Sequence, residues 1–364
     1  MKKKLSMLTI AAVASLGLVA CGGKTDSVEK VKIGMMTDSG TIDDRSFNQA
    51  TWEGIERYKS DYGTIETQYI KPLGETTADY MQAADDLITA GNQMIVAPGF
   101  KFDEAITKLQ EQYPDIKFVT IDGQPTTVAD NTISIYFAEQ EAGFLAGVAA
   151  ALESKTGKVG FIGGMKSSAV EKFGYGYVAG VAYANKHLGT NAEVTDFLYN
   201  GTFTDVAGGQ AQAGSMYDKG IDIIFTAAGR VGNGVITEAK TRTEAGDQVY
   251  VIGVDVDQYE LGKMANGESV ILTSAVKRVD NASYSKVEEF MNGTFTGGEV
   301  ITMNAELDGV GLPENNPNLT ASTQETANDI LAEIKSGNLV VPSTEEDTKS
   351  FLEEMNYEGP KVNF

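Results

Sequence analysis

Four charged residues stand directly after apolar stretches that have the composition of buried strands. Asp38 follows the stretch IGMMT, Asp122 follows FVTI, Asp255 follows VYVIGV and Lys277 follows ILTSAV. Ligands of open α/β sheets bind beyond the carboxyl ends of the strands, so we expect these side chains to converge on one cleft. A single charged residue at a strand end can be explained as a turn cap or as a solvated side chain. Four such residues together indicate a binding site. Carboxylates accept hydrogen bonds and an ammonium group donates them, which suits a small polar ligand.

The segment around the first of these residues adds an aromatic ring and a carboxamide. In IGMMTDSGTIDDRSFNQATWEG, residues 33–54, an apolar strand leads into an acidic turn and then into a helix that Phe47 and Asn48 open. An aromatic ring offers a stacking surface, while a carboxamide both donates and accepts hydrogen bonds. Together with Asp38, these two residues favour a small, flat, polar ligand over a phosphate or a metal ion.

The two most conspicuous charges of this segment, Asp43 and Asp44, predict a different role. A turn that gathers carboxylates can bind calcium, but the bidentate glutamate of an EF-hand loop would fall on Gln49. We therefore predict no metal site here. We expect Asp44 to cap the following helix, because its side chain can accept hydrogen bonds from the free N–H groups of the first turn.

The chain lacks the motifs of phosphate binding and of nucleophilic catalysis. It contains no GxxxxGK[ST] sequence, and its glycine-rich segments at 160–164 and 229–234 do not match GxGxxG. Its single histidine, His187, stands near an expected helix end, where a cation favours the helix dipole. One histidine excludes an HExxH zinc site, and this environment excludes a Ser–His or Cys–His pair. We predict a binding protein without a cofactor rather than an enzyme.

The elements that position these residues follow from the hydrophobic pattern. Short β-branched or apolar stretches alternate with amphipathic stretches of helical period, which predicts βαβ units and parallel sheets. In the first half we expect strands at 31–37, 65–70, 93–97, 117–121 and 132–137, with helices at 46–60, 78–90, 103–112 and 139–152. The second half repeats the pattern with strands at 158–163, 192–198, 222–226, 249–254 and 270–275, followed by a helix at 279–292.

Two such halves in a chain of 364 residues predict an α/β fold of two doubly wound parallel-sheet lobes with a ligand cleft between them. This is the type I periplasmic binding fold. We predict an N-terminal lobe of residues 31–137 plus about 277–304, and a C-terminal lobe of about 138–276 plus 305–364. A bilobed dehydrogenase or kinase would give the same alternation, so the cleft residues have to decide the function.

The N-terminus has the pattern of a lipoprotein signal. Residues 5–20 form a nearly uncharged run that is too short to span a bilayer, and three lysines precede it. Residues 1–20 therefore predict a signal peptide. The run ends in LVACG at 18–22, which looks like a lipobox. That pattern predicts that Cys21, the only cysteine, carries a diacylglyceryl group and becomes the mature N-terminus. Its two acyl chains would anchor the protein, with the polar residues 21–30 as a tether.

The charge of the chain restricts its partners. The formal net charge is −22, and removal of the N-terminal lysines with the signal makes it more negative still. Such a surface repels nucleic acid and anionic lipid headgroups. We expect a monomer at the extracytoplasmic side of the cell membrane, held by its lipid anchor and without nucleic acid as a partner.

The chain resembles the basic membrane protein family of lipoproteins, and in particular its purine nucleoside receptors. The similarity is close in TDSGTIDDRSFNQATWEG, clear in EAGFLAGVAA, KVGFIGGM, AAGRVGNGVI and YVIGVDVDQ, and extends through ILTSAVKRV. It covers residues 31 to about 277. The resemblance implies a substrate-binding protein that closes two lobes around a purine nucleoside such as guanosine, adenosine or inosine and delivers it to an ABC permease.

The resemblance also implies roles for the cleft residues. Phe47 would stack on the purine, while Asn48 and Asp38 would bond to the edge of the base. The ribose would be held by hydroxyl hydrogen bonds to Asp122 and Asp255 and by donation from Lys277 to a ribose oxygen. Three carboxylates against one lysine would repel a phosphate, which explains a preference for nucleosides over nucleotides.

The second face of the base is the point at which the resemblance is least specific. Relatives place an aromatic or apolar contact around the AAGxxG loop, where this chain has Gly229 and Arg230. A guanidinium group can stack on a base, so Arg230 is one candidate. The alternative is that Arg230 faces solvent and that Phe100 or Phe225 covers the second face.

Three other functions stay open from the sequence. A receptor for a sugar, an autoinducer or riboflavin would use the same fold, and sugar sites also contain aromatic rings. A surface adhesin would need no ligand in its cleft. A nucleoside hydrolase that uses the adjacent Asp43 and Asp44 is the enzymatic alternative, although we predict no metal site to serve it.

Overall fold

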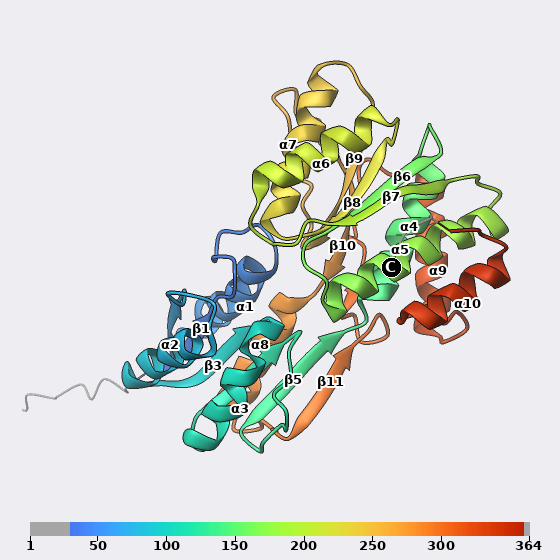
Figure 1. The fold of residues 1–364 in the computed structure, drawn as a ribbon. Helices are drawn as coiled ribbons and strands as arrows, with labels where there is room; N and C mark the ends of the chain where they lie inside the picture. The colour runs from blue at the N-terminus through green and yellow to red at the C-terminus, as the bar shows by residue number, and fades with distance from the viewer. Residues whose placement is uncertain (1–29, 360–364) are drawn as a thin grey trace, which may run out of the picture. The chain divides into compact units, whose positions relative to one another are not determined.

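The computed structural model describes residues 30–359. The first sheet contains β1 (Val31–Met36), β2 (Ile65–Ile70), β3 (Asn92–Pro98), β4 (Lys117–Ile121), β5 (Thr132–Phe137) and β11 (Glu299–Met303). The second contains β6 (Lys158–Gly163), β7 (Glu193–Tyr199), β8 (Ile223–Ala227), β9 (Tyr250–Asp255), β10 (Ile271–Lys277) and β12 (Val310–Gly311). Figure 1 shows the two sheets with their helices.

The two sheets have the same topology. Their strand orders are β11-β5-β4-β3-β1-β2 and β12-β10-β9-β8-β6-β7, and each pair of neighbours is parallel except β10 and β12. The inner strands read as continuous apolar runs because helices bury both of their faces. In each sheet the first strand lies between the second and the third. The connections therefore diverge at that strand and leave a crevice at its carboxyl end.

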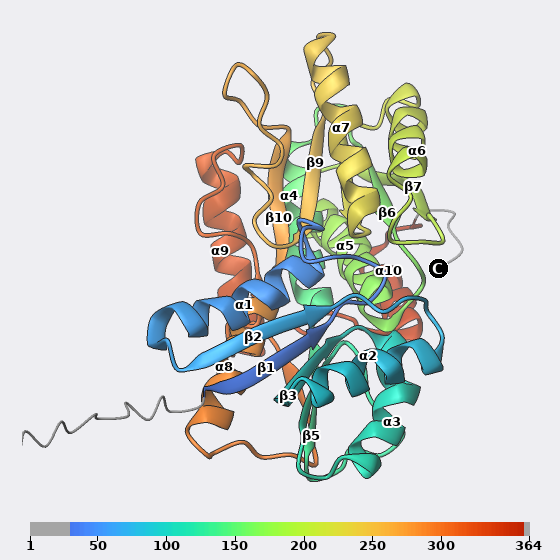
Figure 2. The ribbon, with the colours of Figure 1, turned by 90° about the vertical axis from the view of Figure 1, so that its left-hand side faces the viewer.

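Helices cover both faces of each sheet. The first sheet is covered by α1 (Phe47–Tyr62) and α8 (Val279–Met291) on one face, and by α2 (Thr77–Thr89), the short 3₁₀ turn η1 (Phe100–Phe102) and α3 (Asp103–Gln112) on the other. Figure 2 shows α1 and α8 on the opposite side of this sheet from α2 and α3. The second sheet is covered by α4 (Glu139–Glu153) and α5 (Ser168–His187) on one face, and by α6 (Val206–Asp218) and α7 (Arg230–Glu244) on the other.

Small residues bring α4 and α5 unusually close together. A Cβ atom added at Gly147 would lie 2.1 Å from the carbonyl oxygen of Tyr177, and one added at Gly180 would lie 2.1 Å from that of Phe144. Glycine is required here because no side chain fits between the two backbones. The pair forms a rigid support under the second sheet, and its N-terminal ends carry Glu139 and Phe173 toward the site.

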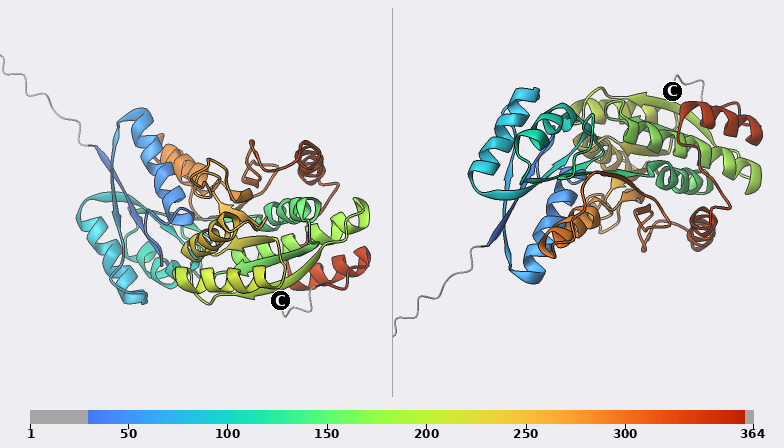
Figure 3. Two further views of the ribbon diagram at one scale, coloured as in Figure 1. Left: turned by 90° about the horizontal axis from the view of Figure 1, so that it is seen from above. Right: turned by 90° about the horizontal axis from the view of Figure 1, so that it is seen from below.

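The C-terminal residues add two more helices to the second sheet's side of the fold. These are α9 (Ala321–Lys335), which packs on α4, and α10 (Glu345–Met355), which packs on α5. The views from above and below in Figure 3 show the red α10 beside the green α5. Within residues 30–359, no helix has the length and apolar character needed to cross a membrane.

The structure confirms the predicted fold class and ten predicted strands, each to within two residues at either end. Asp44 caps α1 as predicted: its carboxylate accepts from the backbone N–H groups of Ser46, Asn48 and Gln49 at 2.9 to 3.1 Å. The sequence did not predict β11, β12, α9 and α10. The predicted signal peptide, the lipobox with Cys21 and most of the tether lie outside the described residues.

Candidate ligand-binding site

A pocket lies where the carboxyl ends of the strands from both sheets meet, and it contains about 670 Å³ of empty space with its open mouth included. All eight residues predicted to bind the ligand line it, as does Phe100, whereas Phe225 does not. The first sheet and its connections contribute Asp38, Phe47, Asn48 and Asp122, and the second contributes Gly229, Arg230, Asp255 and Lys277.

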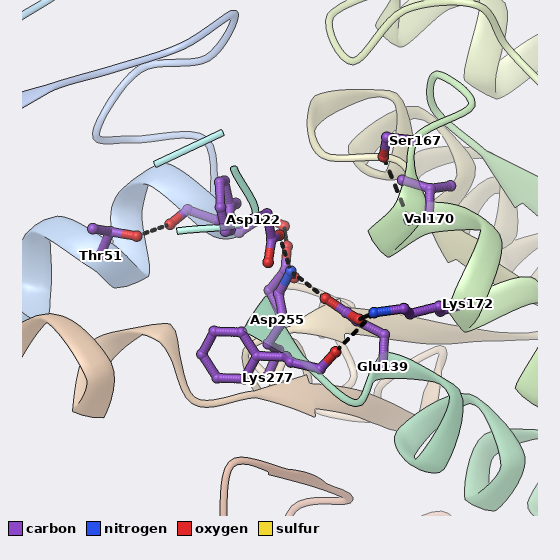
Figure 4. Close-up of polar contacts among 11 residues, drawn as sticks. Thr51, Asp122, Glu139, Ser167, Val170, Lys172, Asp255 and Lys277 are labelled. Carbon is purple, nitrogen blue, oxygen red and sulfur yellow. Dashed lines mark hydrogen bonds and ion pairs between the residues drawn. The ribbon is translucent and has the colours of Figure 1, made fainter. Parts of the chain in front are cut away.

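Lys277 is the charged centre of the pocket. It ends β10, is 2% exposed, and its Nζ forms a short ion pair with Asp122 across the two sheets. The same Nζ lies 3.9 Å from Asp255 and 3.5 Å from Glu139 (Figure 4). Burial alone would lower the pKa of Lys277, but the three carboxylates outweigh burial and raise it. Lys277 therefore stays charged and fixed in place.

The two carboxylates beside Lys277 are held by strained backbone. Asp122 follows β4 with φ of 57°, and Asp255 ends β9 with φ of 66°. The left-handed region is uncommon for residues other than glycine, and aspartate is among those that tolerate it best. Such strain persists where the surroundings impose it, often at functional sites. Burial raises the pKa of Asp255, while Lys277 and a hydrogen bond from Ser46 oppose that shift.

One carboxylate oxygen of Asp122 is unpaired in the part of the chain that the structure describes. Its Oδ2 contacts Lys277, whereas its Oδ1 is buried and has no hydrogen-bond partner anywhere in residues 30–359. An unpaired buried acceptor is costly unless something donates to it. The pocket therefore presents a charged acceptor that is ready for a ligand hydroxyl or amine.

Glu139 is a member of this cluster that the sequence analysis missed. It is the first residue of α4, is 1% exposed, and lies 3.7 Å from Lys172 on the side away from Lys277 (Figure 4). Burial raises its pKa to about 7, although Lys277 opposes the shift. Its sequence signal is weak, because a glutamate in the first turn of a helix is common and stands on the surface in most helices.

Phe47 lies against the cluster. The Nζ of Lys277 is 4.8 Å from the centre of its ring. This cation–π contact fixes one side of the ring and adds to the restraint on Lys277. Phe47 is partly buried and lines the pocket, so the rest of its surface faces a ligand.

Asp38 and Asn48 form a pair in which the amide orients the acid. Asn48 is 3% exposed; its Oδ1 accepts from the backbone N–H of Asp38 at 3.2 Å, and its Nδ2 donates to Asp38 Oδ1 at 2.9 Å and to Asp44 at 2.8 Å. The carboxamide groups are thus engaged with the protein. Gly40 N–H also donates to Asp38 Oδ1, which leaves Oδ2 as the acceptor that faces the pocket. Burial raises the pKa of Asp38, against these hydrogen bonds.

Gly229 and Arg230 form the part of the rim at the start of α7. Gly229 has φ of 56° and ψ of −129°, a conformation that only glycine adopts readily. It turns the chain so that the N-terminus of α7 begins at the pocket. Arg230 is exposed at the mouth, so its side chain is a rim group rather than a buried one.

The two aromatic residues predicted as alternatives for the second face of a base have different positions, since only Phe100 lines the pocket. Phe225 is fully buried and packs against Phe161 and Phe173 in the core of the second sheet, so it is not a pocket residue. Phe100 does line the pocket, and Phe203, which the sequence analysis missed, lines it from the second sheet. Phe203 follows β7 after the turn Asn200–Gly201, so the rule that strand ends carry site residues would have found it.

The arrangement combines aromatic surface with fixed hydrogen-bond groups. Rings from both sheets, Phe47 and Phe203, share the pocket with acceptors on Asp38, Asp122 and Asp255 and with the ammonium of Lys277. Asp44, by contrast, accepts four hydrogen bonds around the start of α1, so its pairing with Asp43 is not an acid–base pair. This chemistry recognises a ligand that has a flat part and several hydroxyl or amine donors.

The chain is similar to known proteins in sequence and in structure. A family model described as ABC transporter substrate-binding protein, PnrA-like, matches residues 30–345. A CD4+ T-cell-stimulating antigen of Listeria monocytogenes is 34% identical over 94% of this chain and 99% of its own. The ABC transporter nucleoside-binding protein BmpA of Lactococcus lactis is 33% identical over 94% of this chain and all of its own. Among solved structures, an ABC transporter solute-binding protein of Aeropyrum pernix superposes with a TM-score of 0.77, at 25% identity over 90% of this chain and 97% of that one.

Proposed function

Because the chain belongs to the family of PnrA-like ABC transporter substrate-binding proteins, we propose that it binds a purine nucleoside in this pocket and delivers it to an ABC permease. Family membership confirms the resemblance predicted from the sequence. The chain is a substrate-binding protein and not an enzyme, as we predicted, since its relatives are substrate-binding proteins of ABC transporters.

The spare oxygen of Asp122 is the observation that carries the proposal. A buried carboxylate oxygen without a partner among residues 30–359, next to Lys277, can accept a hydrogen bond from the ligand. The hydroxyl groups of a ribose supply such donors, and Asp255 would accept the second one. A phosphate would bring more negative charge against these carboxylates, which supports a nucleoside rather than a nucleotide.

We propose that the base lies between rings from the two sheets. Phe47 would cover one face and Phe203 the other, with Arg230 at the rim near the exposed edge. The base edge would then donate to Asp38 Oδ2, and Asn48 would act mainly by orienting that carboxylate. A relative whose name describes nucleoside binding supports a nucleoside as the ligand.

The movements and the location of the protein are part of the same proposal. Each sheet with its covering helices would be one lobe, with the boundaries predicted from the sequence, and the lobes would close on the ligand as hinged bodies. The protein would be a monomer, anchored through a lipid on Cys21 at the outer face of the cell membrane. Relatives named basic membrane proteins support a membrane-associated location.

A thermal-shift panel tests this function. The panel contains adenosine, guanosine, inosine, the matching free bases, ribose, arabinose and riboflavin, each at saturating concentration. A ligand that binds only the folded protein raises its stability by RT ln(1 + [L]/Kd). We expect the nucleosides to raise Tm and the bases and pentoses to have much smaller effects. Stabilisation by a pentose or riboflavin alone would indicate a different receptor, and stabilisation by nothing would favour the adhesin.

A further inference from the structure

We propose that three consecutive residues of the turn before α1, Asp44 to Ser46, form an interlobe latch with the second sheet that favours the closed arrangement with or without ligand. The latch adjoins the pocket, because Asp44 and Asp255 also line it. Two of its three partner residues, Asn233 and Gln258, do not contribute to the pocket lining. Its effect on affinity rests on the proposed function, whereas its effect on closure does not.

Each of the three residues makes one hydrogen bond to a different element of the second sheet's side. The carbonyl oxygen of Asp44 accepts from Asn233 Nδ2 on α7 at 3.4 Å. The carbonyl oxygen of Arg45 accepts from Gln258 Nε2 at 2.8 Å. The hydroxyl of Ser46 donates to Asp255 at the end of β9.

The backbone of the turn is shaped to make these contacts. Arg45 has φ of 63°, which is strained for a long side chain and directs its carbonyl group toward the second sheet. Its N–H group donates to Gln49 Oε1 at 3.1 Å, and Asp44 holds the start of α1. The acceptor of the latch is therefore fixed by contacts within the first sheet's side alone.

The donor is fixed in the same way on the other side. Gln258 is 4% exposed, and its side-chain Oε1 accepts from Val254 N–H at 3.2 Å. The backbone N–H of Gln258 donates to Ser274 Oγ at 3.1 Å. A Cβ atom added at Gly253 would lie 2.5 Å from that Oε1, so a glycine makes room for the amide. Both halves of the bond between Gln258 and Arg45 are thus preorganised, and the bond costs little further ordering when the sheets approach.

As a consequence, Gln258 influences ligand affinity without contacting the ligand. If binding requires the closed arrangement, the apparent Kd equals the intrinsic Kd divided by the closed fraction. Loss of the latch lowers that fraction and weakens binding of every ligand by the same factor. Loss of a pocket contact, by contrast, weakens binding most for the ligands that use it.

Gln258→Glu removes the latch bond and keeps the local hydrogen bond of this side chain. The carboxylate keeps an acceptor for Val254 N–H but replaces the donor to Arg45 with a second acceptor. Asn233→Ala removes another latch bond without adding charge. Gln112→Glu, at an exposed position of α3, is the control for the added charge.

Two measurements on the full chain test the latch. Small-angle X-ray scattering without ligand should give a larger radius of gyration for Gln258→Glu and, to a smaller degree, for Asn233→Ala than for the unmodified and control proteins. Calorimetry should give adenosine, guanosine and inosine affinities that Gln258→Glu weakens by one common factor of about three to ten.

The outcomes distinguish the latch from the proposed function. An unchanged radius of gyration in both variants, or a loss that differs among the nucleosides, overturns the latch. If the unmodified protein binds no nucleoside, the proposed function fails, and the scattering comparison still decides whether the latch exists.

Discussion

Replacing Asp122 by asparagine should weaken nucleoside binding through the loss of one charged acceptor. The exchange is nearly isosteric, and asparagine tolerates the φ of 57° at this position, so the turn after β4 should persist. Lys277 keeps two other carboxylates nearby, Glu139 at 3.5 Å and Asp255 at 3.9 Å, so the cluster should not collapse.

The expected magnitude follows from the unpaired Oδ1 of Asp122. A hydrogen bond to a charged group contributes about 1.5 to 3 kcal/mol, and one between neutral groups about 0.5 to 1.5 kcal/mol. The difference is about 1 to 1.5 kcal/mol, which corresponds to an affinity roughly five- to tenfold lower. Asp115→Asn, at an exposed position of the same sheet's side, makes the same change of charge and should leave the affinity unchanged.

Calorimetry with deoxynucleosides tests whether Asp122 contacts a ribose hydroxyl. Adenosine, 2′-deoxyadenosine and 3′-deoxyadenosine are titrated into the unmodified protein and Asp122→Asn. If Asp122 accepts from one ribose hydroxyl, the penalty of the substitution should nearly vanish for the deoxynucleoside that lacks this hydroxyl. A penalty of equal size for all three ligands would refute the contact with ribose.

The remaining predictions concern the base, the pH and the anchor. Phe47→Ala and Phe203→Ala should each weaken nucleoside binding about tenfold by loss of stacking, which calorimetry measures. Phe225→Ala should instead lower the free energy of unfolding by about 3 to 5 kcal/mol, because that ring fills the core. Denaturant unfolding measures this second effect. Burial raises the pKa of Asp38, and a proton on this acceptor competes with the ligand. Affinity should therefore fall as the pH is lowered, and the fall should begin at a higher pH than an ordinary aspartate would require. Titration at several pH values checks this, and an affinity that rises toward acid pH would contradict it. Cys21→Ser should shift the protein from the membrane fraction to the soluble one, as immunoblotting of fractions would show, and equal partitioning would argue against the lipid anchor.

The sequence predicted the fold well because the parallel strands are buried on both faces. Runs such as FVTI before Asp122 and VYVIGV before Asp255 are almost entirely apolar, and charged residues mark where each run ends. The strand-end rule therefore located charged residues that lie far apart in the sequence. The edge strand β11, Glu299–Met303, was missed because three of its five residues are exposed and two of them, Glu299 and Thr302, carry polar side chains.

The parts of the site that were not predicted depend on packing between segments distant in sequence. Glu139 looks like an ordinary first-turn acid until α4 places it beside Lys277. Phe225 and Phe203 have the same side chain and both belong to the second sheet's side. Only the packing shows that the first fills the core and the second lines the pocket. The engagement of Asn48 with Asp38 and Asp44 likewise follows from the shape of the turn.

Direct titration of the purified protein with guanosine and adenosine tests the central claim. We expect saturable binding of one nucleoside per chain, with far weaker binding of the free bases, of ribose and of the corresponding 5′-monophosphates. Calorimetry that detects no binding of any purine nucleoside, or that finds the monophosphates bound as tightly as the nucleosides, would contradict it.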